Sequence, residues 1–269
     1  MKRHLTKMAG VVGMAVLMAG ATLSTASADA LDDIKAAGNI KIGIFPDFPP
    51  FSSATADLSL QGYDIDVGNF IGDKLGVDVE FVNVTGQNRI PLLNDKRVDV
   101  LLSVGYSDER FKVIDYAAPY APYYIGVIGP AAMKVEGKAD LAGKSVAVNR
   151  GTLEDTSLTE AAAADTTIRR FDNYSAVIQA FISGQVDLMV VGNDVGARVL
   201  AEQTDLEPEQ KFSLLTSPSN VALNHGEEPL KAALTAAIVE MQDSGVLNSA
   251  SEKWLKVPLN PADLFKKWK

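Results

Sequence analysis

The chain has 269 residues, 47% hydrophobic and 22% charged, a globular composition with room for one large domain or two of ordinary size. Acidic side chains outnumber basic ones by 34 to 25, and this net charge of −9 argues against a nucleic-acid partner, because phosphate binding requires a basic surface. The absence of cysteine excludes disulfides and cysteine-based metal centres, and the two histidines are too few for a histidine-rich metal site, so we expect no metal and no cofactor.

Residues 1–28 have the pattern of a signal peptide. Three basic residues open the segment, residues 8–23 are apolar and uncharged, and residues 26–28 read Ala-Ser-Ala, which fits a signal-peptidase site. A transmembrane anchor is the alternative, but the apolar run is short for a membrane span and rich in glycine. We predict secretion with cleavage after Ala28, which would leave 22 basic and 34 acidic side chains.

Along the rest of the chain, short β-branched runs alternate with segments of helical period. Apolar side chains recur on one face of residues 63–75 and 174–183, and a third helix of this kind is expected at 233–241. The expected strands are 39–45, 77–83, 98–104, 145–148, 167–171 and 186–191. This alternation predicts α/β architecture, with parallel sheets covered by helices on both faces.

Two extended stretches bounded or broken by prolines, 119–130 and 212–224, interrupt the alternation. A self-contained set of strands and helices lies between them. We interpret the stretches as crossings between two lobes, with lobe 1 formed by residues 29–122 and 222–269 and lobe 2 by residues 123–221. Two lobes joined twice enclose a cleft and can close over a small ligand by a hinge motion.

The common nucleotide-binding and hydrolase motifs are absent from the sequence. The triplet Gly-Lys-Ser at 143–145 resembles the end of a phosphate-binding loop, but Lys138 stands where that loop needs its first glycine, and the triplet precedes a strand instead of following one. No GxGxxG, GxSxG or HExxH occurs. We expect His225 to be a solvated turn residue.

Arg110 follows the strand at 98–104, at the carboxyl end where open α/β sheets bind ligands. A guanidinium there could hold a carboxylate through two parallel hydrogen bonds, although a surface ion pair is the simpler interpretation of an arginine after two acids. Phe48 lies in a proline-rich loop after the first strand. It could form an apolar wall for a ligand or belong to the core.

Gly151 and Thr152 open a helix expected at 153–164. Thr152 is a good N-cap, and Asp155 three residues later resembles a capping box, so a well-capped helix explains the pattern by itself. The same geometry would let free N–H groups at the helix start attract a carboxylate. We expect Arg150 to face solvent.

Six segments, in their order and spacing, together resemble the extracellular solute-binding protein family 3, the periplasmic polar amino-acid-binding proteins of ABC importers. They are IKIGIFPDFPPF (40–51), GYDID (62–66), IPLLNDKRVDV (90–100), SDERFKVIDYAAPY (107–120), LAGKSVAVNRGT (141–152) and AFISGQVDLMVVGND (180–194). The resemblance implies the type II periplasmic-binding-protein fold, in which two α/β lobes joined by two crossover strands close on one small molecule. It also implies a periplasmic location and a permease in the inner membrane as partner.

The resemblance further implies which residues contact the ligand. Arg110 would bind the α-carboxylate, and Phe48 would pack against the ligand side chain. The other implied contacts lie at a strand end and at a helix start: Ser103, Gly105, Gly151 and Thr152.

The expected partner of the ligand ammonium departs from the family pattern. An aspartate usually stands five residues after Asp187, but here that position is Gly192. If Asp194 reaches the cleft, the ammonium has its charge partner; if only Asn193 does, the ligand is another small carboxylate. Phe45 stands where binders of cationic amino acids place an acid, so a lysine or arginine ligand is disfavoured.

Two other functions are alternatives for this sequence. A periplasmic enzyme resembling a cyclohexadienyl dehydratase would need an acid or base in the cleft, for which Glu154, Asp155 and Asp194 are candidates by position, but helix capping and ligand charge pairing explain them more simply. A receptor sensor domain would need a following membrane span, which this sequence does not contain. We therefore expect a binding protein without catalytic residues, and a monomer, since no segment has the pattern of a helical zipper.

Overall fold

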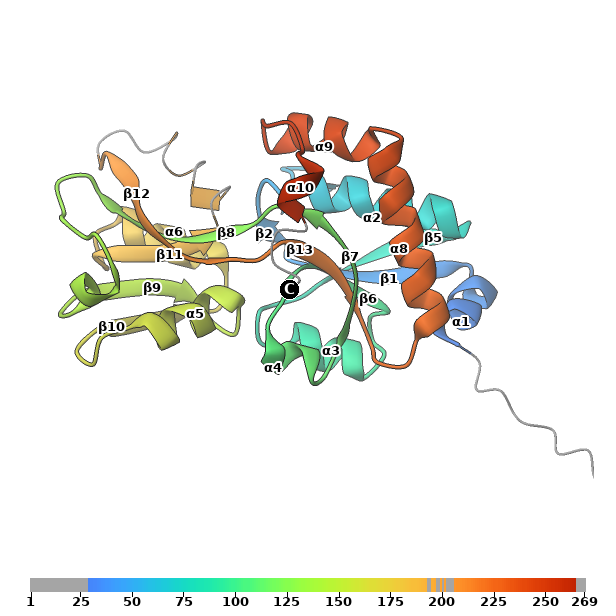
Figure 1. Cartoon of the computed structure of the whole chain (residues 1–269), viewed down its shortest axis with the longest axis horizontal. Coiled ribbons are helices and arrows are strands. Elements are labelled where there is room, and N and C mark those ends of the chain that lie inside the picture. Colours follow the sequence, from blue (N-terminus) through green and yellow to red (C-terminus); the bar gives the residue numbers. More distant parts are fainter. Residues whose placement is uncertain (1–28, 193–194, 197–198, 200, 202–205, 265–269) are drawn as a thin grey trace, which may run out of the picture.

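The computed structural model describes residues 29–264 except 193–194, 197–198, 200 and 202–205. The expected signal peptide, and both Asn193 and Asp194, lie outside the described residues. Two α/β lobes lie side by side, and the chain passes between them twice (Figure 1). Among the described residues, no helix combines the length and the apolar character needed to cross a bilayer.

The first lobe is built on a five-stranded sheet in the order β5-β1-β6-β13-β7. Its strands are β1 (Asn39–Ile44), β5 (Asp78–Asn83), β6 (Val100–Gly105), β7 (Asp115–Ala121) and β13 (Ser219–Leu223). Its helices are α1 (Ala30–Ala37), α2 (Tyr63–Leu75), α3 (Arg89–Asn94), α4 (Asp108–Phe111), α8 (Glu228–Asp243), α9 (Val246–Trp254) and α10 (Pro261–Leu264). A small sheet follows β1 and consists of β2 (Asp47–Phe48), β3 (Ser52–Ala54) and β4 (Leu60–Gln61).

The second lobe has its own five-stranded sheet in the order β10-β9-β11-β8-β12. Its strands are β8 (Tyr124–Pro130), β9 (Ser145–Asn149), β10 (Thr167–Phe171), β11 (Leu188–Gly192) and β12 (Pro208–Thr216). Its helices include α5 (Leu153–Ala161), α6 (Tyr174–Ile182) and a 3₁₀ helix, η1 (Lys138–Leu141).

Helices cover both faces of the first sheet because its central strands are apolar on both sides. In β6, Val100 and Leu102 join the main hydrophobic core, whereas Leu101 and Val104 join a second cluster with Leu93 of α3. This two-sided burial is the reason that the strand reads as a continuous apolar run. It also fixes the end of β6, with Ser103 and Gly105, at the boundary between core and cleft.

Both sheets are mixed, so the expectation of parallel sheets is wrong in part. The strands β5, β1 and β6 run parallel, as do β10, β9 and β11, but β13 runs antiparallel to β6, and β8 runs antiparallel to β11. The reversed strands, β8 and β13, are those that directly follow a link between the lobes. Each starts at the edge of its sheet where the neighbouring parallel strand ends, with Ser219 opposite Gly105 and Ile125 opposite Gly192, and therefore runs in the opposite direction.

The two links between the lobes lie next to each other. Residues 122–123 connect β7 to β8, and residues 217–218 connect β12 to β13; the backbone N–H of Ser217 donates to the carbonyl of Tyr123 at 3.0 Å. The predicted lobe boundary between 221 and 222 falls inside β13, which pairs with strands of the first lobe. We therefore propose that the second lobe ends at the 217–218 link.

Candidate ligand-binding site

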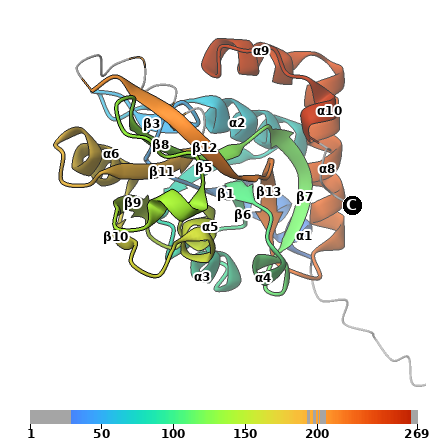
Figure 2. The same cartoon turned by 60° about the vertical axis from the view of Figure 1, so that its left-hand side comes forward.

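A small cavity is lined by residues of both lobes. Figures 1 and 2 show the part of the molecule concerned, where α5 of the second lobe faces α3 and α4 of the first. The first lobe lines it with Phe48, Arg89, Ser103, Gly105, Arg110 and Ser219. The second lobe and its link line it with Tyr123, Leu153, Glu154 and Tyr174. Its volume is about 10 Å³, roughly the room that one water molecule needs. A larger molecule therefore enters only when the lobes separate.

Arg110 faces this cavity and not bulk water. It lies in the single turn of α4, which begins where the Ser107 hydroxyl accepts a hydrogen bond from the Arg110 backbone N–H. Its side chain donates from Nη1 to the carbonyl of Gly105 at 3.1 Å, and the residue is only 8% exposed. Burial, together with the positive charge of Arg89, lowers the pKa of Arg110 to about 10, so the guanidinium remains charged at neutral pH.

A second arginine, Arg89, lies in the same cavity and is 2% exposed. Its Nη1 donates to the carbonyl of Ser103 at 3.1 Å, and its guanidinium lies 5.1 Å from the centre of the Phe45 ring. Its Nε has no hydrogen-bond partner among the described residues. Within the same part of the chain, neither Arg89 nor Arg110 forms an ion pair with a carboxylate.

The opposite wall carries a buried acid. Glu154 stands in the first turn of α5, where the helix dipole favours a negative charge, and it is 2% exposed. Its Oε1 accepts hydrogen bonds from the hydroxyls of Tyr123 at 2.6 Å and Tyr174 at 3.1 Å. Burial raises the pKa of Tyr174 well above its ordinary value, and the negative charge of Glu154 adds to the shift. The Tyr174 hydroxyl therefore stays protonated and can donate.

Ser103 joins the cavity to a buried network behind it. Its backbone has φ of 52°, in the left-handed region that non-glycine residues rarely adopt. Its hydroxyl donates to Asp64 Oδ2 at 2.7 Å, and the Tyr120 hydroxyl donates to Asp64 Oδ1 at 2.7 Å while accepting from the Ser103 N–H at 2.6 Å. Asp64 is 1% exposed, and burial raises the pKa of its carboxyl to about 6. The network fixes the strained strand end that faces the cavity.

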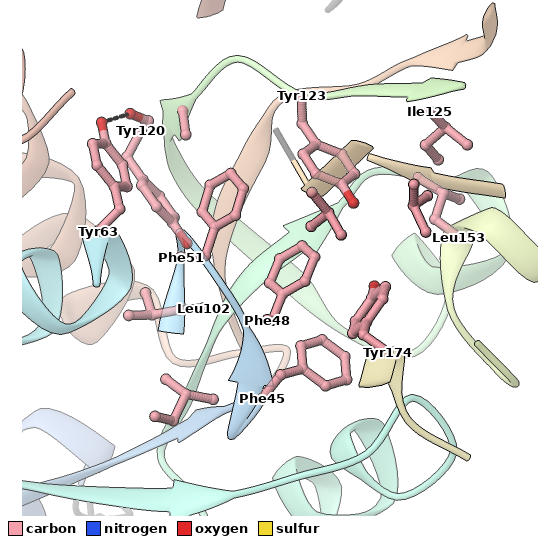
Figure 3. Close-up of a cluster of buried hydrophobic side chains, with 14 of the residues drawn as sticks. Phe45, Phe48, Phe51, Tyr63, Leu102, Tyr120, Tyr123, Ile125, Leu153 and Tyr174 are labelled. Carbon is pink, nitrogen blue, oxygen red and sulfur yellow. Dashed lines mark hydrogen bonds between the residues drawn. The ribbon is translucent and has the colours of Figure 1, made fainter. Parts of the chain in front are cut away.

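Aromatic rings form the apolar side of the site. Phe48 lies between Phe51 and Tyr174 and stacks on both, with ring centres 4.9 Å and 4.5 Å away (Figure 3). Tyr123 meets the Phe48 ring edge-on at 6.1 Å. Phe48 belongs to the first lobe, Tyr174 to the second lobe and Tyr123 to the link between them. This stack therefore joins the lobes. Phe51 is fully buried and belongs to the core.

Gly151 and Thr152 lie beside the cavity but outside its lining. The N–H of Gly151 donates to Asp155 Oδ2 at 3.0 Å, and the Thr152 hydroxyl donates to the carbonyl of Asn149 and caps α5 by accepting from the Asp155 N–H. Both residues press against Gly86 of the first lobe, where a Cβ would come within 2.3 Å of the Arg150 carbonyl oxygen. In this arrangement they form a contact between the lobes.

The cavity therefore brings together four of the eight predicted ligand-binding residues: Phe48, Ser103, Gly105 and Arg110. The predicted partners of an ammonium, Asn193 and Asp194, lie outside the described residues. Sequence reasoning missed Arg89, Tyr123, Leu153, Tyr174 and Ser219, and considered Glu154 only as a catalytic candidate. In the sequence, Arg89 stands between the polar residues 87–88 and the apolar segment 90–93, and this context does not mark it as a ligand-binding residue.

Two further residues behave as the sequence indicated. Arg150 is partly exposed and pairs with Asp172 at 3.3 Å. His225 is exposed and its Nε2 lies 3.0 Å from the Phe111 carbonyl oxygen, away from the cavity lining. Among the described residues, no group of three or more His, Cys, Asp or Glu side chains is arranged to hold a metal ion.

Known proteins of similar sequence and structure bind amino acids. The chain is 28% identical to the L-cystine-binding protein TcyJ of Escherichia coli (strain K12), over 93% of this chain and 96% of the relative. A crystal structure of a mutant of ArgBP from T. maritima superposes with a TM-score of 0.79 at 25% identity and covers 85% of this chain and 100% of its own. The ancestral amino acid-binding protein AncCDT-1, a precursor of cyclohexadienyl dehydratase, gives a TM-score of 0.77 at 27% identity, over 85% of this chain and 100% of its own.

These structural likenesses confirm the expected fold, two α/β lobes with a type II periplasmic-binding-protein arrangement. The family described as "Bacterial extracellular solute-binding proteins, family 3" matches residues 40–257, which span both lobes and both links. This chain belongs to the bacterial extracellular solute-binding proteins of family 3.

Proposed function

We propose that this protein captures a small amino acid or related small carboxylate between its lobes and delivers it to the permease of an ABC importer. The observation that carries the proposal is the cavity between the lobes, where Arg110 and Arg89 from one side face Glu154 from the other. Buried charges of both signs that are not paired with each other suit a ligand that carries both a carboxylate and an ammonium. The names of relatives, such as the L-cystine-binding protein, support an amino-acid ligand.

Ligand binding favours the closed arrangement because the ligand would contact both lobes. Arg110 binds the α-carboxylate, Ser103 and Gly105 present polar groups at the strand end, and Phe48 packs against the apolar part of the ligand. A ligand that binds the closed state better than the open state shifts the population toward closure. Micromolar affinity requires about −8 kcal/mol, which a bidentate arginine contact in a dry cavity together with an aromatic wall can supply.

The remaining predicted contacts belong to the same proposal. Gly151 and Thr152 would share the carboxylate through backbone N–H groups when the lobes open and re-close around a ligand. Asn193 or Asp194 would approach the ammonium together with Glu154; with the uncharged Asn193, the lining keeps the net charge of +1 that Arg89, Arg110 and Glu154 give it. Export to the periplasm, cleavage after Ala28, a monomeric state and docking on an inner-membrane permease complete the functional hypothesis.

We propose no enzymatic activity, because the relatives are named as binding proteins and Glu154 is held by two tyrosine hydroxyls that would orient it toward a cation. Since AncCDT-1 is a precursor of cyclohexadienyl dehydratase, purified protein should be incubated with prephenate and arogenate. Turnover of either would overturn the non-enzymatic assignment.

The proposal is tested by calorimetry of the exported protein with the common amino acids and small organic acids. At least one amino acid should bind with micromolar or better affinity, and Arg110→Ala should abolish binding with unchanged circular dichroism. Arg150→Ala is the matched control, because this arginine is partly exposed and pairs outside the cavity. No binding of any amino acid or carboxylate by the wild type, or unchanged affinity in Arg110→Ala, would refute the proposal.

A further inference from the structure

We propose that the ligand is a small acidic amino acid, and that Arg89 is the residue that selects its second carboxylate. This inference rests on the proposed function and names the ligand class of the same site. It makes Arg89 a specificity residue beside the carboxylate anchor Arg110. Three observations carry it: the unfilled hydrogen-bonding capacity of Arg89, the charge balance of the cavity, and the spacing of the two arginine anchors.

Arg89 has more donors than its protein partners use. A guanidinium carries five N–H donors, and the described part of the chain gives Arg89 one carbonyl acceptor and the face of the Phe45 ring. Its Nε is buried without a partner among the described residues. Burying a charged group is costly unless its hydrogen bonds are satisfied. Holding the Ser103 carbonyl and stacking on Phe45 therefore do not account for a cation at this position, whereas a ligand carboxylate does.

The charges of the cavity also favour a ligand with a net charge of −1. Among the described lining residues, Arg89 and Arg110 are positive and Glu154 is negative. Asp64 lies behind Ser103 and is not in the lining. An amino acid with an acidic side chain balances this set, since its two carboxylates match the arginines and its ammonium matches Glu154. A neutral amino acid leaves one guanidinium unpaired, and a basic one adds a further positive charge.

The anchors of the two arginines fit a short diacid. Arg89 is tied to the carbonyl of Ser103 and Arg110 to that of Gly105, both on β6. Two residues of a strand span about 7 Å. Both arginines line the same small cavity. The carboxylates of a four- or five-carbon acidic amino acid can then meet one guanidinium each, with Glu154 and its two tyrosines on the opposite side for the ammonium.

The test compares acids with their amide isosteres, which have nearly the same shape. Calorimetry of the wild-type protein should show L-glutamate or L-aspartate binding at least ~10-fold more tightly than L-glutamine or L-asparagine, because the amide leaves the Arg89 charge uncompensated. Arg89→Met keeps an unbranched apolar stem and removes the charge together with all the N–H donors of the guanidinium. This variant should lose the preference for the acid, while Arg150→Met should keep it. Glutarate, which lacks an ammonium, should bind the wild type more weakly than L-glutamate.

The outcomes separate this inference from the proposed function. If an amino acid binds but the wild type does not prefer the acid to the amide, the inference is wrong and the proposed function stands. An acid preference that persists in folded Arg89→Met would show that another residue selects the carboxylate, and would also overturn it. If no amino acid binds at all, the proposed function itself fails. Should Arg89→Met not fold, the wild-type comparison of acid with amide decides.

Discussion

The two lobes present opposite charges to the cavity. The first lobe contributes the guanidiniums of Arg89 and Arg110, both supported by carbonyl groups at the end of β6. The second contributes the carboxylate of Glu154, supported by tyrosine hydroxyls. A ligand of the proposed kind would thus have one orientation, with its carboxylates on the first lobe and its ammonium on the second. Changes on each side should therefore alter recognition of different ligand groups.

Glu154→Gln should have the largest effect, because it removes the negative charge opposite the two arginines. The amide can still accept from a tyrosine, but it cannot pair with an ammonium, and we expect amino-acid affinity to fall by roughly 100-fold. Affinity for glutarate, which lacks the ammonium, should fall less or rise. Calorimetry measures both, and Glu160→Gln, an exposed acid on the same helix, is the control. Equal losses for the two ligands would contradict the division of charge between the lobes.

Gly86→Ala should act on closure and not on either set of charges. In the closed arrangement the new methyl group would lie 2.3 Å from the Arg150 carbonyl oxygen and 2.9 Å from the Thr152 side chain, both in the other lobe. The open state has no such clash, so we expect about a 10-fold loss of affinity for every ligand without loss of stability. Small-angle scattering at saturating ligand should show a larger molecule than the wild type.

The control for this variant is Gly137→Ala, whose Cβ would meet no atom of the described residues within 4 Å. It should leave affinity and dimensions unchanged. If Gly86→Ala instead weakens acids and amides by different factors, its effect would lie in ligand contacts, and the assignment of Gly86 to the contact between the lobes would be wrong.

Asp47→Asn should weaken closure slightly. In the first lobe, Asp47 Oδ2 accepts a hydrogen bond from the backbone N–H of Ser175, in the first turn of α6 of the second lobe, at 2.8 Å. Loss of the charge weakens this bond and its interaction with the helix dipole, so we expect a two- to five-fold loss of affinity, roughly 0.5–1 kcal/mol. The effect should shrink at high salt. Asp78→Asn, an exposed acid at the start of β5, should show no such change.

Asp64→Asn should change ligand affinity little at neutral pH. Its effect should appear in the pH dependence of stability, because Asp64 belongs to the buried network behind the first-lobe side of the cavity. The pKa of its carboxyl rises from 3.8 to about 6 on burial, so the folded protein holds a proton that the unfolded chain has released. The free energy of unfolding therefore falls by about 3 kcal/mol at most as the pH rises from about 4 to about 6. Above that range this group causes no further change. Urea unfolding of wild type and Asp64→Asn at several pH values should show this difference, and a pH-independent difference would contradict it.

Much of the fold could be predicted because it depends on local periodicity. The helix at 63–75 and the strand at 167–171 were predicted with their observed bounds. The helix expected at 233–241 extends over 228–243 because Pro229 suits the first turn of a helix and does not end it. The mixed sheets could not be predicted from period alone, since the direction of β8 and β13 depends on how the chain passes between lobes.

The candidate site was predictable only where a residue follows a strand end in the family pattern. Arg110 and Ser103 have such a signal, and the structure places both at the cavity. Arg89 has none, because its burial depends on the Ser103 carbonyl and the Phe45 ring, which come from other parts of the sequence. Glu154 and Tyr174 lie on different helices of the second lobe and Tyr123 lies on its link, so only the tertiary fold brings the three together. Site residues that come from separate elements therefore leave little trace in local sequence patterns.

The hydrogen bond between the links, from the N–H of Ser217 to the carbonyl of Tyr123, has a mechanical consequence. Two strands fastened to each other bend as one ribbon, so the lobes share a single pivot and swing essentially along one path. Opening then has one principal coordinate. The distance between one pair of fluorescent labels, one on each lobe across the cleft, would therefore follow the whole motion. Its distribution should shift as a whole or show two populations, and should not become broad.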